Sequence, residues 1–160
     1  MTAALAVGIM GGASFVGTTV AGWLTDRIDP RRVLSGAFVL RAASLFVLPF
    51  VSESWGLFGF SIMYGLDWFA TGPGITAILA ENFGQDRVGR LFGLVFVAHQ
   101  IGGALSAIGG GWARVYFGDY QFAFLAGGVV GLSAAFLALT IRSRERPGAP
   151  MAFTTEFAGA

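Results

Sequence analysis

The sequence predicts an all-α membrane protein with five transmembrane helices, and three observations lead to that prediction. Of the 160 residues, 55% are hydrophobic and only 12% are charged, with a mean hydropathy of +0.71. A soluble domain carries about 25% charged residues, so this composition is typical of a chain in lipid. The apolar residues form runs of roughly 20 residues, which is the length that crosses a bilayer. The charged residues gather in short turns between these runs, where the chain must return to water.

Five apolar runs are the predicted spans, and they extend over residues 2–24, 33–51, 56–80, 91–113 and 122–141. Pro73 is expected to kink or break the third span, because proline removes a backbone hydrogen bond and clashes with the preceding turn. The spans and their turns make one transmembrane domain over residues 1–146. Residues 147–160 contain two prolines and no helical period, so we expect a disordered cytoplasmic tail there.

Small residues recur at four-residue spacing in the first and last runs. Such stripes let helices approach closely in lipid, where packing must replace the hydrophobic force between helices. We therefore expect both runs to pack against neighbouring helices through these residues, which are Gly8, Gly12, Ala13, Gly17 and Ala21 in the first run and Ala123, Gly127, Gly131 and Ala135 in the last.

The arginines predict how the chain is oriented. All ten basic residues are arginines, and eight of them lie in the turns 22–32 and 81–90 and in residues 142–146 after the last run. Because arginine accumulates on the cytoplasmic side, we expect a multi-pass protein of the cell (inner) membrane with its N-terminus outside and its C-terminus in the cytoplasm. An outside N-terminus without a signal sequence also leads us to expect further chain before Met1.

The composition argues against several kinds of chemistry. The chain has no cysteine, which excludes disulfides, thiol nucleophiles and cysteine-bound metals. A single histidine argues against a zinc site, and a net charge of +1 gives no reason to expect a nucleic-acid partner. No ATP-binding loop is present. We therefore expect no enzyme activity, no cofactor and no metal, with the lipid bilayer and a small solute as partners.

Polar residues inside the spans are the candidate site residues, because each is costly in lipid unless it is paired or wetted. Tyr64, Asp67, Thr71 and Gly74 recur at helical spacing, which places a phenol, a carboxylate, a hydroxyl and bare backbone on one face. A desolvated carboxylate can hold a proton near neutral pH. Asp67 is therefore the first candidate for a proton or substrate site, and a structural ion pair with Arg41 is the alternative.

The other polar candidates lie in the second and fourth runs. His99 and the adjacent Gln100 could hydrogen-bond a substrate or relay a proton, or they could join two helices. Arg41 could hold an anionic substrate, or its charge could be structural. No nucleophile motif accompanies Asp67 and His99, so an intramembrane enzyme is the weakest interpretation.

The charged turn between the first two spans is the candidate gate loop. Its plain interpretation is a positive anchor on the cytoplasmic side. Its sharper interpretation is a latch, in which a carboxylate at a helix end docks on a neighbouring helix N-terminus and arginines pair with acids. The residues concerned are Gly22, Asp26, Arg27, Arg31 and Arg32.

This loop resembles the GxLaDRxGRR signature of the major facilitator superfamily, with Leu24 also in register. Asp29 and Pro30 stand where that family usually has glycine and a basic residue. GLDWFATGPG is similar to the tenth helix of monocarboxylate-transporter-like bacterial members of the family. LFGLVFVAHQIGGALSAIGGGW, followed by GDYQFAF, is similar to the eleventh helix and the start of the twelfth.

The resemblance implies the C-terminal half of such a transporter, with the five spans as helices eight to twelve and the N-terminal bundle missing. A complete transporter of this kind would move a small organic solute, for instance a carboxylate, by alternating access, with a coupling proton. In the family, helices eight, ten and eleven line the pathway, which favours Asp67, His99 and Gln100 over Arg41 as ligands. The rival prediction is a stand-alone small membrane protein that forms a homo-oligomeric pore or scaffold.

Overall fold

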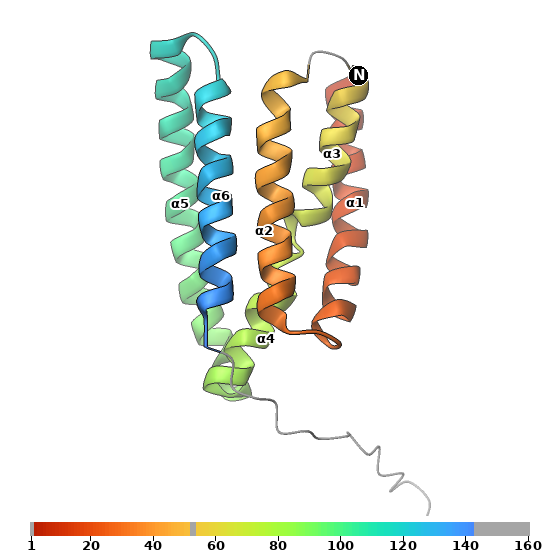
Figure 1. Cartoon of the computed structure of the whole chain (residues 1–160), viewed down its shortest axis with the longest axis vertical. Helices are drawn as coiled ribbons and strands as arrows, with labels where there is room; N and C mark the ends of the chain where they lie inside the picture. Colours follow the sequence, from red (N-terminus) through yellow and green to blue (C-terminus); the bar gives the residue numbers. More distant parts are fainter. Residues whose placement is uncertain (1, 52–53, 143–160) are drawn as a thin grey trace, which may run out of the picture.

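The structure is a computed structural model that describes residues 2–51 and 54–142 (Figure 1). Its described residues form helices and short connections, with no strand among them. The expected tail over 147–160 lies outside the described residues, as do Ser52 and Glu53 in the turn after the second run. The prediction of an all-α membrane fold is confirmed.

The helices follow the five predicted runs. Four helical segments are long and apolar enough to cross a membrane: Thr2–Thr25, Pro30–Phe50, Gln85–Phe117 and Gln121–Thr140. The second and third of these segments each include a short 3₁₀ helix. In chain order the elements are α1 (Thr2–Thr25), α2 (Pro30–Val47), η1 (Leu48–Phe50), α3 (Ser54–Trp68), α4 (Thr71–Phe83), η2 (Gln85–Arg87), α5 (Val88–Phe117) and α6 (Gln121–Thr140). The third predicted run is divided between α3 and α4, which together extend along the bundle as one broken crossing (Figure 1).

The break in the third run precedes Pro73 by a few residues. α3 ends at Trp68, and α4 begins at Thr71. Pro73 is therefore the third residue of α4, where its missing N–H has no intrahelical partner to lose. The expected interruption is confirmed, and the proline lies in the first turn of the new helix instead of at the break itself.

Glycines determine where two of the helices end. Gly84 closes α4 and Gly118 closes α5, with φ angles of 86° and 82°, a left-handed region that glycine adopts without strain. α5 therefore extends beyond the predicted end at residue 113. Arg114 lies in its last turn, where a positive charge is favourable next to the carbonyl ends of the helix.

Two helix pairs form the tightest packing of the bundle. α1 packs along α3, and α2 packs along α6. A Cβ atom at Gly17 would overlap the backbone of Leu66, and one at Gly131 would lie 3.2 Å from Cβ of Ala42. Both predicted small-residue stripes therefore make close helix contacts, except at Gly8 and Gly12, where an added Cβ atom would meet nothing within 4 Å.

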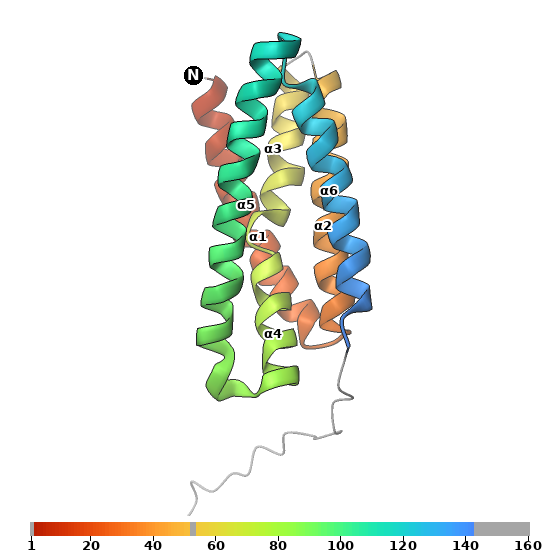
Figure 2. The same ribbon diagram turned by 90° about the vertical axis from the view of Figure 1, so that its left-hand side faces the viewer.

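α5 lies at the edge of the bundle, where it meets α6 at one end and α4 at the other (Figure 2). Its main contacts are with α4, η2 and α6, and Ala113 is its one buried residue. Its exposed side chains are mainly apolar, which suits contact with acyl chains or with further helices.

Candidate functional site

The most deeply buried charge among the described residues is Asp67, near the end of α3. Only 1% of its surface is exposed. Arg41, on α2, donates from Nε to Oδ2 of Asp67 at 2.5 Å, so the pair joins two helices across the inside of the bundle. Burial of either charge alone would be costly, and pairing offsets that cost. The alternative that the sequence left open, a structural ion pair between these residues, is what the geometry forms.

The ion pair leaves one oxygen of the carboxylate without a hydrogen-bond donor among the described residues. Oδ1 of Asp67 is buried and accepts no hydrogen bond from any described residue. Arg41 is less enclosed, with 21% of its side chain exposed, and its guanidinium stands 5.8 Å from the ring centroid of Phe38. The carboxylate therefore keeps the capacity to accept a further hydrogen bond or a proton.

The face predicted for Tyr64, Asp67, Thr71 and Gly74 is not a single helical face, because the chain leaves the helix after Trp68. Tyr64 belongs to a row of rings on α3 and lies 5.4 Å from Trp68 by ring centroids. Thr71 is half-buried at the start of α4, and Gly74 packs against α2. Helical spacing wrongly predicted one shared face, because the break between α3 and α4 changes the direction in which residues after Trp68 face.

His99 and Gln100 lie on α5 and are exposed. The ring of His99 stacks on Phe96 with centroids 6.2 Å apart. Because the main contacts of α5 are with α4, η2 and α6, the described bundle does not bring His99 or Gln100 to the Asp67 side chain. The arrangement does not support an active site made from Asp67 and His99.

A cavity of about 300 Å³ lies beside Asp67. Its walls come from α1, α2 and the end of α3, and they are mainly apolar, with Leu24, Val33 and Leu40 among them. Arg32 and Ile28 border it near the α1–α2 loop. The cavity thus connects the candidate gate loop with the buried carboxylate.

The α1–α2 loop is organised by Asp29, a residue that in the sequence is only a departure from the family signature. Asp29 caps the N-terminus of α2, with Oδ1 accepting the backbone N–H of Arg31 at 2.9 Å, and Pro30 follows as the first helical residue. The Asp-Pro pair itself is the signal that could have identified this cap. The side-chain hydrogen bond from Arg31 holds the pKa of Asp29 below its ordinary value.

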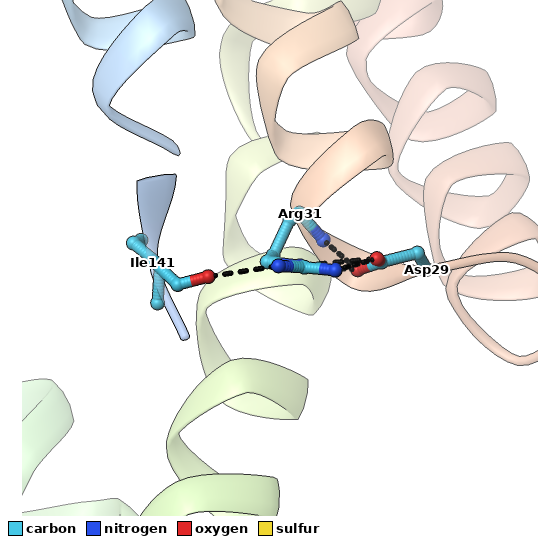
Figure 3. Close-up of polar contacts among 3 residues, drawn as sticks. All are labelled: Asp29, Arg31 and Ile141. Carbon is cyan, nitrogen blue, oxygen red and sulfur yellow. Dashed lines mark hydrogen bonds and ion pairs between the residues drawn. The ribbon is translucent and has the colours of Figure 1, made fainter. Parts of the chain in front are cut away.

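Arg31 also connects this loop to the end of the bundle. Its Nε donates to both carboxylate oxygens of Asp29 at 3.0 Å, and its Nη1 donates to the carbonyl oxygen of Ile141 at 2.9 Å (Figure 3). Ile141 directly follows α6. Arg31 therefore bridges the start of α2 and the end of α6. Arg31 and Ile141 are 110 positions apart in the sequence.

The remaining gate-loop residues lie around this bridge. Arg27 stands over the ring of Trp23, 3.8 Å from its centroid, and Gly22 is half-buried near the end of α1. Asp26 and Arg32 are exposed. Asp29 caps its own helix, α2, and pairs with Arg31 in the same turn. Docking of a gate-loop carboxylate on a neighbouring helix stays a prediction.

Comparisons with known proteins find similarity to one protein family and to several of its members. It matches the family model described as Major Facilitator Superfamily over residues 1–156. It is 37% identical to the Uncharacterized MFS-type transporter YcxA of Bacillus subtilis over 103 residues, which is 60% of this chain and 25% of that protein. It is 34% identical to the Multidrug resistance protein B homolog of Mycobacterium tuberculosis over 132 residues, covering 81% of this chain and 24% of the relative.

A human relative extends the comparison. The chain is 31% identical to Monocarboxylate transporter 11 of Homo sapiens over 142 residues, which is 83% of this chain and 30% of that protein. The chain therefore spans between about a quarter and a third of the length of these relatives. No solved structure matches it.

Proposed function

Because the chain belongs to the Major Facilitator Superfamily, we propose that it forms the C-terminal helices of a secondary active transporter that moves a small organic solute by alternating access. The relatives are transporters, which supports transport over catalysis. The observation that carries the proposal is the buried pair of Arg41 and Asp67 between α2 and α3. Charged residues at such depth are costly, and in membrane proteins they mark ion and substrate pathways.

Asp67 is the proposed site of the coupling proton. Its Oδ1 accepts no hydrogen bond from the described residues and can take a proton without displacing a donor. Protonation would neutralise the carboxylate and weaken its attraction to Arg41, which lies on another helix. Proton binding would thereby favour a different packing of α2 against α3, as a switch between two transporter states requires.

A carboxylate-bearing solute is the proposed substrate. Arg41 would supply a positive charge to it once Asp67 is protonated, because Arg41 then loses its anionic partner. The similarity to a protein named Monocarboxylate transporter 11 also supports this class. His99 and Gln100, with Tyr64 and Thr71, remain proposed pathway residues that would meet the solute in another state of the transporter.

The proposed location is the cell (inner) membrane, with the N-terminus outside and the C-terminus in the cytoplasm. Figure 1 supports this orientation, because the α1–α2 loop, the α4–α5 connection and the end of α6 lie at one end of the bundle. Most of the described arginines belong to these segments, whereas Arg114 lies in the last turn of α5, and the α5–α6 connection is at the opposite end of the bundle. Arginine accumulates on the cytoplasmic side of membranes.

Further helices are the proposed partners of the bundle. The relatives are three to four times longer than the matched region, and α5 presents an almost wholly exposed face. An N-terminal bundle packed beside α5 would allow the two bundles to rock around a central pathway.

Solute uptake by the Asp67→Asn variant tests the proposal. In the transporter expressed from its complete reading frame, this variant should lose solute uptake driven by an inward proton gradient. Asp86→Asn, an exposed carboxylate in η2, is the matched control and should keep it. Unchanged proton-driven uptake by Asp67→Asn would refute the proton role.

A homo-oligomeric pore or scaffold is the second candidate, and one observation favours it. A Cβ atom added at any glycine of α5 would meet no atom of another described element within 4 Å, so a second copy could approach that helix closely. Crosslinking that traps a discrete homo-oligomer, together with conductance in planar bilayers, would support this candidate. Monomeric chain without conductance would exclude it.

A further inference from the structure

An apolar groove lies between α1 and α2, and it is one space with the cavity beside Asp67. Its walls are partly accessible, since 52% of Val20 and 40% of Ile28 are exposed. α1 and α2 contact each other little, because α1 packs mainly on α3 and α2 mainly on α6. Small residues such as Ala21 and Gly36 leave the space between the two helices unfilled. The groove is therefore open to the surroundings of the bundle.

The groove has a positive charge at its loop end. Arg32 borders it beside the α1–α2 loop and is exposed. The other two arginines of the loop are engaged, because Arg27 stands over an indole ring and Arg31 is held by Asp29. The side chain of Arg32, in contrast, forms no ion pair or hydrogen bond with another described residue. An anionic group at this end of the groove would find a guanidinium that is available to it.

The length of the groove matches one leaflet of a bilayer. Arg32 and Leu40 are the first and last residues of α2 that line it, roughly 12 Å apart along the helix at 1.5 Å per residue. Half of the hydrocarbon core of a bilayer is about 15 Å thick. The α1–α2 loop lies at the end of the bundle that we propose to face the cytoplasm (Figure 1), and the cytoplasmic leaflet carries the anionic lipids. A lipid of that leaflet has its phosphate at the level of Arg32 and its acyl chains at the level of the apolar walls.

We propose that the α1–α2 groove binds one acyl chain of an anionic phospholipid of the cytoplasmic leaflet, and that Arg32 donates hydrogen bonds to the lipid phosphate. Arginine suits this contact because its planar fork matches the geometry of phosphate oxygens. A zwitterionic lipid offers the same phosphate but brings a positive group close to Arg32, so the groove should prefer a net negative headgroup. The site goes beyond the proposed transport function, because its occupancy is measured without any solute movement.

Photolabelling of the full chain in nanodiscs tests the site. The probe is phosphatidylglycerol with a diazirine on one acyl chain, present as a small fraction in phosphatidylcholine. The label should map by mass spectrometry to groove residues such as Val20 and Leu40, and excess unlabelled phosphatidylglycerol should prevent it. Phosphatidylcholine with the same diazirine chain should label these residues about fivefold less, which is the preference that one arginine near the membrane surface supplies. Equal labelling by the two lipids would overturn the proposal.

A pair of arginine variants tests the headgroup contact. Arg32→Gln should remove the preference for phosphatidylglycerol. Arg90→Gln is the matched control, because Arg90 is an exposed residue in the first turn of α5, at the same end of the bundle (Figure 1). It removes the same charge away from the groove and should keep the preference. A preference that survives Arg32→Gln, or that both variants lose equally, would overturn the role of Arg32.

A pair of glycine variants tests the position of the acyl chain. Gly36 lines the groove, and a Cβ atom there would meet nothing within 4 Å, so Gly36→Leu should fill the groove without disturbing the fold. Labelling of the groove residues should then fall to the level seen with excess unlabelled lipid. Gly12→Leu, on α1 outside the groove and with equally open space, is the control and should keep the labelling. Undiminished labelling in Gly36→Leu would overturn the proposed location.

Inorganic phosphate distinguishes a lipid from a free anion. Free phosphate gains nothing from the apolar walls, so sodium phosphate and sodium chloride at equal ionic strength should leave the same preference for phosphatidylglycerol. Loss of that preference in phosphate alone would show that Arg32 binds the free anion, and the lipid assignment would then be wrong.

Discussion

Nε of Arg41 lies 2.5 Å from Oδ2 of Asp67, and this contact joins α2 to α3 in the interior of a bundle that is otherwise mainly apolar. The two residues are 26 positions apart, so folding of the helices must bring them together. Because the carboxylate of Asp67 is almost fully buried, its charge is costly without Arg41, so the pair is both a structural bond and a site of sensitivity to protonation.

Removing one member of the pair should destabilise the bundle. Arg41→Met leaves Asp67 as an uncompensated buried charge, which typically costs about 3–5 kcal/mol of folding free energy. The double variant with Asp67→Leu should recover most of that loss. Denaturant titration in detergent of the two single variants and the double variant measures the coupling energy between the two side chains. If the change in unfolding free energy of the double variant equals the sum of the two single changes, the side chains do not interact.

Gly17 should tolerate no side chain. A Cβ atom there would overlap the carbonyl group of Leu66, so Gly17→Ala must push α1 away from α3 and should cost about 1–3 kcal/mol. Gly12→Ala is the control on the same helix, where a methyl group meets nothing within 4 Å. Equal unfolding free energies for the two variants would contradict the observed α1–α3 packing.

These contacts show which parts of the molecule sequence can predict. The spans were predictable because hydrophobic length is a local property, and the stripes around Gly17 and Gly131 were predictable because small-residue spacing is local too. The partner of Asp67 could only be named as an alternative, since pairing with Arg41 depends on how α2 and α3 pack. The face through Thr71 was wrong because helical spacing does not indicate where a helix breaks.

Asp29 should make the stability of the loop depend on pH. Its pKa in the folded chain is lowered chiefly by the hydrogen bond from Arg31, so it contributes stability above its unfolded pKa. That contribution should be lost as the pH falls through the lower, folded pKa. Thermal unfolding in detergent from neutral to strongly acidic pH measures this dependence.

Substitutions at Asp29 separate the cap from the charge. Asp29→Ala should cost about 1 kcal/mol at neutral pH by removing the cap of α2. Asp29→Asn keeps a capping oxygen and should lose less, while removing this residue's contribution to the pH dependence. An acid transition that is unchanged in Asp29→Asn would show that another group is responsible.

Arg31 should protect the end of α6. Arg31→Lys keeps the positive charge but loses the planar fork that contacts Asp29 and Ile141 together. Amide hydrogen exchange near the end of α6 should therefore become faster in this variant. Arg32→Lys is the neighbouring control, and equal exchange in the two variants would contradict the bridge between α2 and α6.

The most direct test of the transport account compares two modes of solute movement in the Asp67→Asn variant of the transporter expressed from its complete reading frame. Accumulation driven by a proton gradient requires the coupling proton, whereas counterflow of labelled against unlabelled solute at equal pH requires only a folded, moving carrier. The account predicts that Asp67→Asn loses accumulation and keeps counterflow. Proton-driven accumulation equal to that of the unmodified transporter would contradict it.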